Sequence, residues 1–259
     1  MSKKSISQIK EEFEQADAAQ LESLYEIYGS DERSGVQKLI GAYRKKAEAM
    51  QKERMRLEAM RSFEHKYSDK HGGTYSLICG IDEAGRGPLA GPVVAGAVIL
   101  PDDCEILYLN DSKKLSPAKR ELLYDEIMEK AEAVGVGMAS PARIDEINIL
   151  QATYEAMREA VSNLGVSPQL LLNDAVTIPD VSIPQVPIIK GDAKSVSIAA
   201  ASIIAKVTRD RLMVQYDEIL PGYGFAQHKG YGSKEHIEAI RRLGPTPIHR
   251  QTFIKNFLV

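Results

Sequence analysis

The chain has 259 residues, 44% hydrophobic and 27% charged, a composition that is typical of globular proteins and excludes a wholly disordered chain. Its 33 Lys and Arg against 36 Asp and Glu give a formal net charge of −3, which argues against a polycation that coats nucleic acid. Two cysteines, Cys79 and Cys104, are too few for a disulfide framework, and no apolar run approaches the roughly 20 residues of a membrane span. We therefore expect a cytoplasmic protein with no membrane partner.

The first 70 residues are expected to form a helical extension. Apolar residues recur at helical spacing from Ser5 to about Tyr28, and a second, heavily charged helix is expected from Val36 to about Tyr67. Mixed charge along such a helix is typical of a solvated face, although dimerisation, a partner or a nucleic-acid track are alternatives. The segment HGGTY at 71–75 is typical of a linker, so we place the domain boundary near residue 71.

Residues 71–259 are expected to form one α/β domain, because short apolar strands alternate with helical patterns. The expected strands are 75–81, 93–100, 134–139, 169–173 and 186–189. The expected helices are 117–132, 143–164, 195–216, 234–243 and 247–257, and the helix from 195 has a face of small residues.

Four acidic residues stand where the expected strands end. Asp82 and Glu83 follow the first strand, Asp174 follows LLLN, and Asp192 follows IIKG. Strand ends are where functional groups converge in open α/β sheets, and clustered carboxylates are costly unless they bind a cation. Oxygen ligands favour Mg²⁺ or Mn²⁺ and suit two-metal phosphoryl chemistry. The alternative for each acid is a turn residue or a helix cap.

A glycine-rich loop follows directly. Gly85, Arg86 and Gly87 offer close backbone approach and a planar donor fork for phosphate. The loop lacks the GxxxxGK[ST] pattern of a phosphate-binding P-loop, and it is a poor dinucleotide fingerprint because a strand rather than a helix is expected next. A simple hairpin bend is the alternative.

The stretch IDEAGRGPLAGPVVAGAVIL closely resembles the signature of ribonuclease HII. Further blocks follow in the family's order: DSKKLS at 111–116, LLLND ending at Asp174, KGDAKSVSIAAASIIAKVTRDRLM at 190–213, HKGYGSKEH at 228–236 and GPTPIHRQTF at 244–253. The resemblance covers roughly residues 75–255 and leaves out the first 70. It implies a ribonuclease H-like fold, in which a mixed central sheet is flanked by helices.

The resemblance also implies an activity and a site. It implies an endoribonuclease that cuts the RNA strand of RNA–DNA hybrids and nicks duplex DNA at embedded ribonucleotides, which removes misincorporated ribonucleotides. Two divalent ions, Mn²⁺ or Mg²⁺, would support in-line attack by water that leaves a 3′-hydroxyl and a 5′-phosphate. The implied catalytic and metal-binding residues are Asp82, Glu83, Asp174 and Asp192, with Asp82 and Asp174 as candidates for bridging both ions.

The implied substrate-reading residues are Gly85, Arg86 and Gly87, which would read the 2′-hydroxyl, and Tyr231, which would stack on the following deoxyribose. The 2′-hydroxyl is the group that distinguishes RNA from DNA, and an aromatic plane contacts nucleotides without sequence preference. One departure is Ala175, which stands where many members have a glycine after the aspartate. We expect a small effect on the local turn there.

Several basic residues are candidates for phosphate contacts. Lys113 and Lys114 in DSKKLS and Lys194 near Asp192 are predicted to bind substrate, with a solvated loop as the alternative. Lys206 is spaced to form an ion pair with the residue four positions on, Asp210. The 11 Lys and Arg against 6 Asp and Glu in residues 190–259 indicate a basic track, whereas residues 71–189 hold 8 against 17.

His228, His236 and His249 lack zinc-ligand spacing and are expected to pack or form hydrogen bonds. The C-terminal QTFIKNFL resembles a sliding-clamp peptide, with Gln251, Ile254 and Phe257 at i, i+3 and i+6, and packing on the core is the alternative.

Two other functions stay open at this point. One is a ribonuclease HIII-type hybrid nuclease, which the intact GRG loop argues against. The other is a non-catalytic hybrid-binding protein, which would not need four mutually repelling acids.

Overall fold

The computed structural model describes residues 4–257, and the chain forms two compact units, Met1–Arg56 and Leu57–Val259. The division falls earlier in the chain than residue 71, where the sequence places the domain boundary; that boundary stays a prediction. Among the described residues, no helix is both long and apolar enough to cross a membrane. The cytoplasmic location likewise stays a prediction.

The N-terminal unit is built from helices, which confirms the expected helical extension. It contains α1 (Ile6–Gln15), α2 (Ala18–Tyr28) and most of α3 (Ser34–Met60), up to Arg56. The single helix expected up to Tyr28 is divided at Asp17, because Asp17 and Gln20 form a reciprocal capping box that starts α2. Phe13 lies fully buried in the small apolar core of this unit.

The second unit contains a mixed five-stranded sheet of the ribonuclease H-like type, as expected. Its strands are β1 (Ile78–Ala84), β2 (Val93–Ile99), β3 (Ala133–Ala139), β4 (Leu170–Asp174) and β5 (Gln185–Ile188). The order is β3-β2-β1-β4-β5: β1 pairs antiparallel with β2 and parallel with β4, and β5 continues the parallel side. The carboxyl ends of three neighbouring parallel strands therefore meet at one edge.

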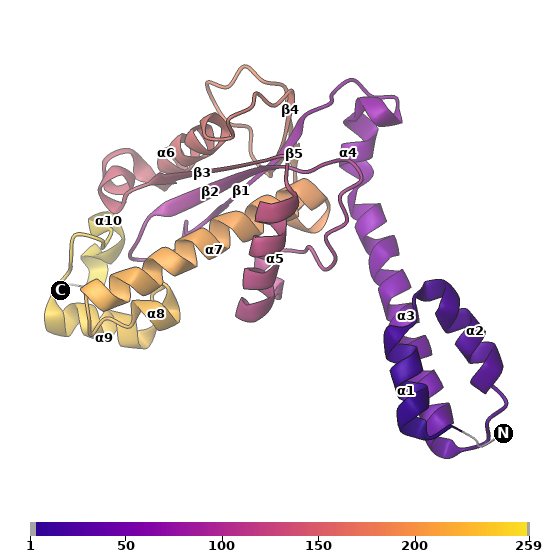
Figure 1. The fold of residues 1–259 in the computed structure, drawn as a ribbon. Helices are drawn as coiled ribbons and strands as arrows, with labels where there is room; N and C mark the ends of the chain where they lie inside the picture. Colours follow the sequence, from indigo (N-terminus) through magenta and orange to yellow (C-terminus); the bar gives the residue numbers. More distant parts are fainter. Residues whose placement is uncertain (1–3, 258–259) are drawn as a thin grey trace. The chain divides into compact units, whose positions relative to one another are not determined.

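Helices cover both faces of this sheet (Figure 1). The helix α6 (Pro141–Ser162) packs on one face, and α7 (Val196–Ile219) and α5 (Pro117–Lys130) lie on the other. The C-terminal region adds α8 (Phe225–His228), α9 (Lys234–Leu243) and α10 (Gln251–Ile254).

The small-residue face of α7 allows this helix to pack very closely on the sheet. A Cβ added at Gly80 on β1 would lie 2.1 Å from the carbonyl carbon of Ser197, and one at Gly96 on β2 would lie 2.5 Å from the Ala201 oxygen. Small residues on both partners allow this approach. It fixes α7, and the short turn before it, against the strands that carry the acids.

A second contact fixes the start of α7. The segment α4 (Ser62–Tyr67) brings the buried Glu64 to the N-terminus of α7, where its Oε1 accepts hydrogen bonds from the Ser195 hydroxyl (2.5 Å) and the Ser197 amide (3.0 Å). A carboxylate stabilises a helix N-terminus through free backbone N–H groups and the helix dipole. The charge pattern alone predicted a solvated helix here, and burial of Glu64 corrects that expectation.

Replacing Glu64 should test this capping contact. We expect Glu64→Ala to lower the free energy of unfolding by about 1–3 kcal/mol, because two donors at a buried helix start lose their acceptor. Glu64→Gln keeps the Oε1 acceptor and should cost less. Urea denaturation measures both, with Glu129→Ala on the exposed face of α5 as the control. Equal stability of Glu64→Ala and the control would contradict the capping role.

Candidate active site

Three of the four acids predicted from the sequence lie together. Asp82 on β1, Asp174 at the end of β4 and Asp192 in the 3-10 turn η3 (Gly191–Ala193) each offer a carboxylate oxygen within 4.8 Å of the others. The parallel register explains the first pair, since Ile81 pairs with Asn173 and the next residues along the two strands are Asp82 and Asp174. We call these three residues the carboxylate cluster.

The local structure holds each acid in place. Asp82 and Glu83 lie within β1 and Asp174 ends β4, whereas the sequence placed the acids just beyond the strands. Asp174 Oδ1 accepts a hydrogen bond of 2.7 Å from the Gly191 amide, which ties the end of β4 to the turn that carries Asp192. The strand β5 leads into this turn through Lys190, whose φ of 58° is left-handed.

The electrostatics of the cluster favour a bound cation. Burial raises the pKa of Asp82 well above its usual value, the nearby charges of Glu83 and Asp174 raise it further, and a hydrogen bond with Ser202 opposes the shift. Burial also raises the pKa of Asp192, assisted by Asp111 and Asp174. Carboxylates that are buried and close together are stable in charged form only with a counter-charge. The all-oxygen donor set fits Mg²⁺ or Mn²⁺.

Glu83 occupies a different position from the cluster. Successive side chains of a strand alternate in direction, and Glu83 Oε1 lies 3.3 Å from Nη1 of Arg86 in the glycine loop. Burial raises the pKa of Glu83, the positive charge of Arg86 lowers it, and the negative charge of Asp174 raises it. Glu83 therefore interacts electrostatically with the cluster. It links the cluster to the loop.

A pocket of about 390 Å³ has Glu83 in its wall, and Lys113, which also lines it, interacts electrostatically with Asp82 and Asp192. Its lining joins the glycine loop to three other parts of the chain: Glu83, Ala84, Gly85, Arg86, Gly87, Ser112, Lys113, Lys206 and Tyr231. Tyr231 is 44% exposed, and a Cβ at Gly87 would lie 3.9 Å from its ring, so the loop and the aromatic ring face each other. The residues predicted to read a ribonucleotide therefore form one concave surface.

Two buried arginines hold the glycine loop from beneath. Arg250 donates to the carbonyl oxygens of Gly85, Arg86 and Gly91, at 2.5 to 3.0 Å, and is fully buried. Arg209, also fully buried, donates to loop carbonyls, and its side chain would clash with any Cβ at Gly85, where φ is 95°. In the sequence both arginines count only toward the basic track of residues 190–259, because a buried cation that pairs with carbonyls has no sequence pattern of its own.

The predicted lysines separate into two groups. Lys113, in the turn η2 (Ser112–Lys114), lines the pocket; burial lowers its pKa, but nearby acids led by Asp82 outweigh this and raise it. Lys114 and Lys194 are exposed and lie outside the lining of this pocket. Lys206 forms the expected ion pair with Asp210, at 2.7 Å, and also lines the pocket.

The acid in DSKKLS was missed as a neighbour of the site. Asp111 caps the turn η2 by accepting from the Lys113 amide at 2.9 Å, and its charge raises the pKa of Asp192. The signal in the sequence was one more acid beside two lysines, which equally describes a solvated loop. Asp111 positions Lys113 at the pocket and adds to the negative charge there.

The three histidines and the C-terminus mainly pack. His236 and His249 are buried with their Nε2 atoms 3.1 Å apart, and burial lowers the pKa of each to about 4, so both are neutral near pH 7. His228 contacts the backbone of Tyr223 at 2.7 Å. In the predicted clamp segment Ile254 is fully buried, and the side chain of Phe257 lies outside the described residues.

Comparisons with known proteins agree with this geometry. The family model for ribonuclease HII matches residues 79–256, and the model for the ribonuclease HII N-terminal domain matches residues 5–68. A ribonuclease HII from Lachnoclostridium phytofermentans is 64% identical over 251 residues, which cover 97% of each chain.

Two solved structures share the fold. Ribonuclease H2 from Pyrococcus horikoshii superimposes with a TM-score of 0.59 at 29% identity, over 70% of this chain and 97% of that one. The ribonuclease HII of Archaeoglobus fulgidus, solved in complex with PCNA, superimposes with a TM-score of 0.56 at 29% identity. The match covers 67% of this chain and 93% of that one. Taken with the family models, these matches show that the chain belongs to the ribonuclease HII family, metal-dependent endonucleases that act on RNA in RNA–DNA hybrids.

Proposed function

We propose that this enzyme cuts at single ribonucleotides embedded in duplex DNA, as well as in longer RNA–DNA hybrids, and leaves a 3′-hydroxyl and a 5′-phosphate. The observation that carries the proposal is the pocket in which the glycine loop faces Tyr231, and which Glu83, the neighbour of Asp82 on β1, also lines. An enzyme that cuts at one ribonucleotide must recognise that nucleotide and its neighbour by close contact. In this pocket the glycine loop would contact the ribonucleotide and Tyr231 its neighbour, close to the acidic residues.

The carboxylate cluster would hold the divalent ions. Asp82, Asp174 and Asp192 would supply most of the oxygen ligands, with Glu83 at the side of the glycine loop. When bound, such ions lower the pKa of water and stabilise the charge that develops on the leaving oxygen. The buried setting strengthens these electrostatic interactions because little bulk water screens them.

The glycine loop would read the ribose. Gly85 and Gly87 carry no side chain, so backbone groups can approach a 2′-hydroxyl, and Arg250 holds the carbonyl of Gly85 in place. Because the arginines beneath fix the loop before substrate arrives, little ordering cost remains at binding. Arg86 and Lys113 would contact phosphates next to the cut.

Tyr231 would test the neighbouring sugar. Its ring is half exposed and lies near two cations, with Lys206 Nζ 5.9 Å and Arg209 Cζ 6.0 Å from the ring centroid. His236 Nδ1 donates a hydrogen bond of 2.8 Å to the Tyr231 carbonyl oxygen and so holds the backbone beneath the ring. A ring held in this way gives a flat surface for a sugar that lacks a 2′-hydroxyl.

A second pocket extends the positive surface. It has a volume of about 530 Å³, and Lys206 and Tyr231 line both pockets. Four basic side chains, among acidic ones, contribute to its wall: Arg120, Lys206, Arg211 and Lys229. We assign it to the phosphates of the duplex on one side of the cut, since phosphate contacts position nucleic acid without reading sequence.

The C-terminal segment has a second candidate role, as a sliding-clamp peptide. The Archaeoglobus fulgidus relative was solved with PCNA, which supports a clamp partner in the family. In this chain Ile254 would have to leave a fully buried position to serve as a clamp anchor. The burial favours packing as the role of this segment.

A duplex with one embedded ribonucleotide tests the proposed function directly. We expect nicking with Mg²⁺ and with Mn²⁺ at that ribonucleotide, and no cutting of the matched all-DNA duplex. Gel electrophoresis of end-labelled strands gives the position and the end groups. Cutting of a long hybrid combined with no cutting of the single-ribonucleotide duplex would refute the proposal and favour a ribonuclease HIII-like specificity.

Neutralising the cluster should abolish catalysis but not binding. We expect Asp82→Asn and Asp174→Asn to lower turnover by roughly 10³-fold, equivalent to about 4 kcal/mol of transition-state stabilisation. Hybrid affinity, measured by fluorescence anisotropy, should survive because the basic surface is intact. The exposed Asp180→Asn is the control. Normal turnover in either cluster variant would refute the metal assignment.

Changing Tyr231 should alter specificity more than general activity. We expect Tyr231→Ala to weaken cutting at a single ribonucleotide by about tenfold or more, since aromatic contacts with a nucleotide contribute about 1–3 kcal/mol. Tyr231→Phe keeps the ring and should retain most activity. The measurement is the ratio of kcat/KM on the single-ribonucleotide duplex to that on a long hybrid. An unchanged ratio in Tyr231→Ala would remove its role in sensing the deoxyribose.

A further inference from the structure

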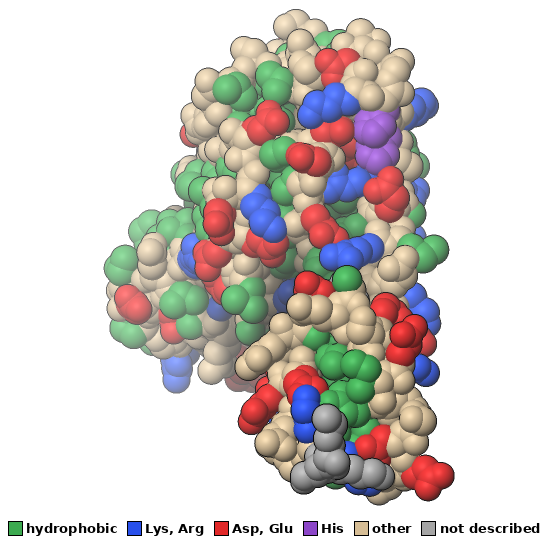
Figure 2. All heavy atoms as spheres, turned by 45° about the vertical axis from the view of Figure 1, so that its right-hand side comes forward, with side chains coloured by type: hydrophobic (Ala, Val, Ile, Leu, Met, Phe, Trp, Pro, Cys, Tyr) green, Lys and Arg blue, Asp and Glu red, His purple; other side chains and the backbone are tan. Residues whose placement is uncertain are grey.

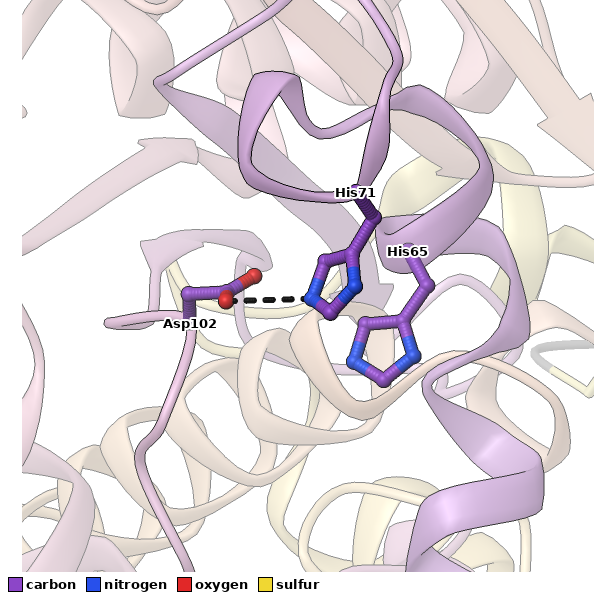
Figure 3. Close-up of side chains that lie close together, drawn as sticks. All are labelled: His65, His71 and Asp102. Carbon is purple, nitrogen blue, oxygen red and sulfur yellow. Dashed lines mark hydrogen bonds and ion pairs between the residues drawn. The ribbon is translucent and has the colours of Figure 1, made fainter.

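A second group of potential metal ligands lies outside the active site. His65 on α4, His71 at the end of the 3-10 turn η1 (Asp69–His71) and Asp102 after β2 offer ligand atoms within 4.8 Å of one another. Histidine side chains gather on the face of the molecule in Figure 2, and Figure 3 shows the two imidazole rings beside Asp102. None of the three residues lines the active-site pocket.

The separations in this group suit a small tetrahedral ion. His71 Nε2 and Asp102 Oδ2 are 3.2 Å apart, and the two imidazole rings stack with centroids 4.0 Å apart. In a tetrahedral zinc site with metal–ligand distances of about 2.0–2.2 Å, neighbouring donor atoms are roughly 3.3–3.6 Å apart. The ring planes are 30° apart, so both histidine side chains would rotate to aim a nitrogen at one ion, from ligand atoms that already lie within 4.8 Å of one another.

Neighbouring side chains already orient two of the three ligands. His65 Nδ1 lies 3.5 Å from Glu58 Oε1, which leaves Nε2 as the ligand atom, and Ser68 donates to Asp102 Oδ1 at 3.4 Å. Histidines that bind metals commonly hold a carboxylate with their other nitrogen, which fixes the tautomer and the direction of the ring. A simple surface ion pair between His71 and Asp102 requires neither the Glu58 contact nor the second histidine.

We propose that His65, His71 and Asp102 bind a divalent transition-metal ion of the zinc type. Two imidazole nitrogens and one carboxylate favour such an ion over Mg²⁺, whereas the all-oxygen active site has the opposite preference. Three protein ligands leave one position for water. The ion would tie the α4–η1 segment to the loop after β2. His71 and Asp102, which come from these two regions, are 31 positions apart in the chain.

The test uses the difference in metal preference between the two sites. The full-length protein is dialysed against Zn²⁺ in a large excess of Mg²⁺, which occupies the carboxylate cluster, and retained zinc is measured by atomic absorption. We expect about one equivalent in the wild type, and at least tenfold weaker binding in His65→Gln and His71→Gln. His228→Gln, which changes a histidine outside the group, should bind as the wild type does.

Glu58→Gln keeps all three ligands and changes only the orienting carboxylate, so it should weaken zinc binding less than His65→Gln does. Zn²⁺ should also raise the thermal unfolding midpoint of the wild type, and this rise should disappear in His71→Gln. Hybrid cleavage with Mg²⁺ should persist in both histidine variants, which separates failure of this site from failure of the active site. Zinc retention equal to wild type in both variants, or no retained zinc in the wild type, would overturn the proposal.

Discussion

The close approach of three carboxylates is the constraint on which the rest of the site depends. Asp82, Asp174 and Asp192 come from separate parts of the chain, and their oxygens lie within 4.8 Å in a partly buried setting. Charges of one sign at this distance repel, and burial adds to the cost. The fold maintains the arrangement through the parallel register of β1 and β4, through the Asp174 contact with the Gly191 amide, and through the tight packing of α7 on the sheet. A divalent cation bound between the three carboxylates would relieve this repulsion.

Substrate recognition is built on a second buried arrangement with the opposite charge. Arg209 and Arg250 place two guanidinium groups under the glycine loop, where burial lowers the pKa of both and hydrogen bonds to loop carbonyls hold the charged forms. These hydrogen bonds hold the loop in one conformation without any contact from a substrate. In the proposed function the cluster would provide chemistry that acts on any phosphodiester bond, and the loop with Tyr231 would restrict that chemistry to a ribonucleotide.

Much of the fold and of the candidate site could be predicted from the sequence. The alternation of strands and helices indicated the α/β unit, and three of the four acids could be expected to lie together because the ends of parallel strands converge. The family resemblance added what spacing alone left open, namely the partnership of the GRG loop with Tyr231. The parts that were missed depend on tertiary contacts: Glu64 looked like one more solvated charge, and Arg250 had no visible partner, because their partners are 131 and 159 to 165 positions away in the chain. The histidine group on α4 and η1 was hidden for the same reason, since its third ligand lies after β2.

The free energy of unfolding without and with Mn²⁺ tests the central claim most directly. If repulsion between the carboxylates destabilises the folded protein, Asp82→Asn should make the metal-free protein more stable than the wild type. The substitution removes one buried charge, and its Oδ1 can still accept the hydrogen bond from the Glu83 amide. Mn²⁺ should then stabilise the wild type more than the variant. A metal-free variant that is less stable than the wild type, with equal stabilisation of both by Mn²⁺, would contradict the account.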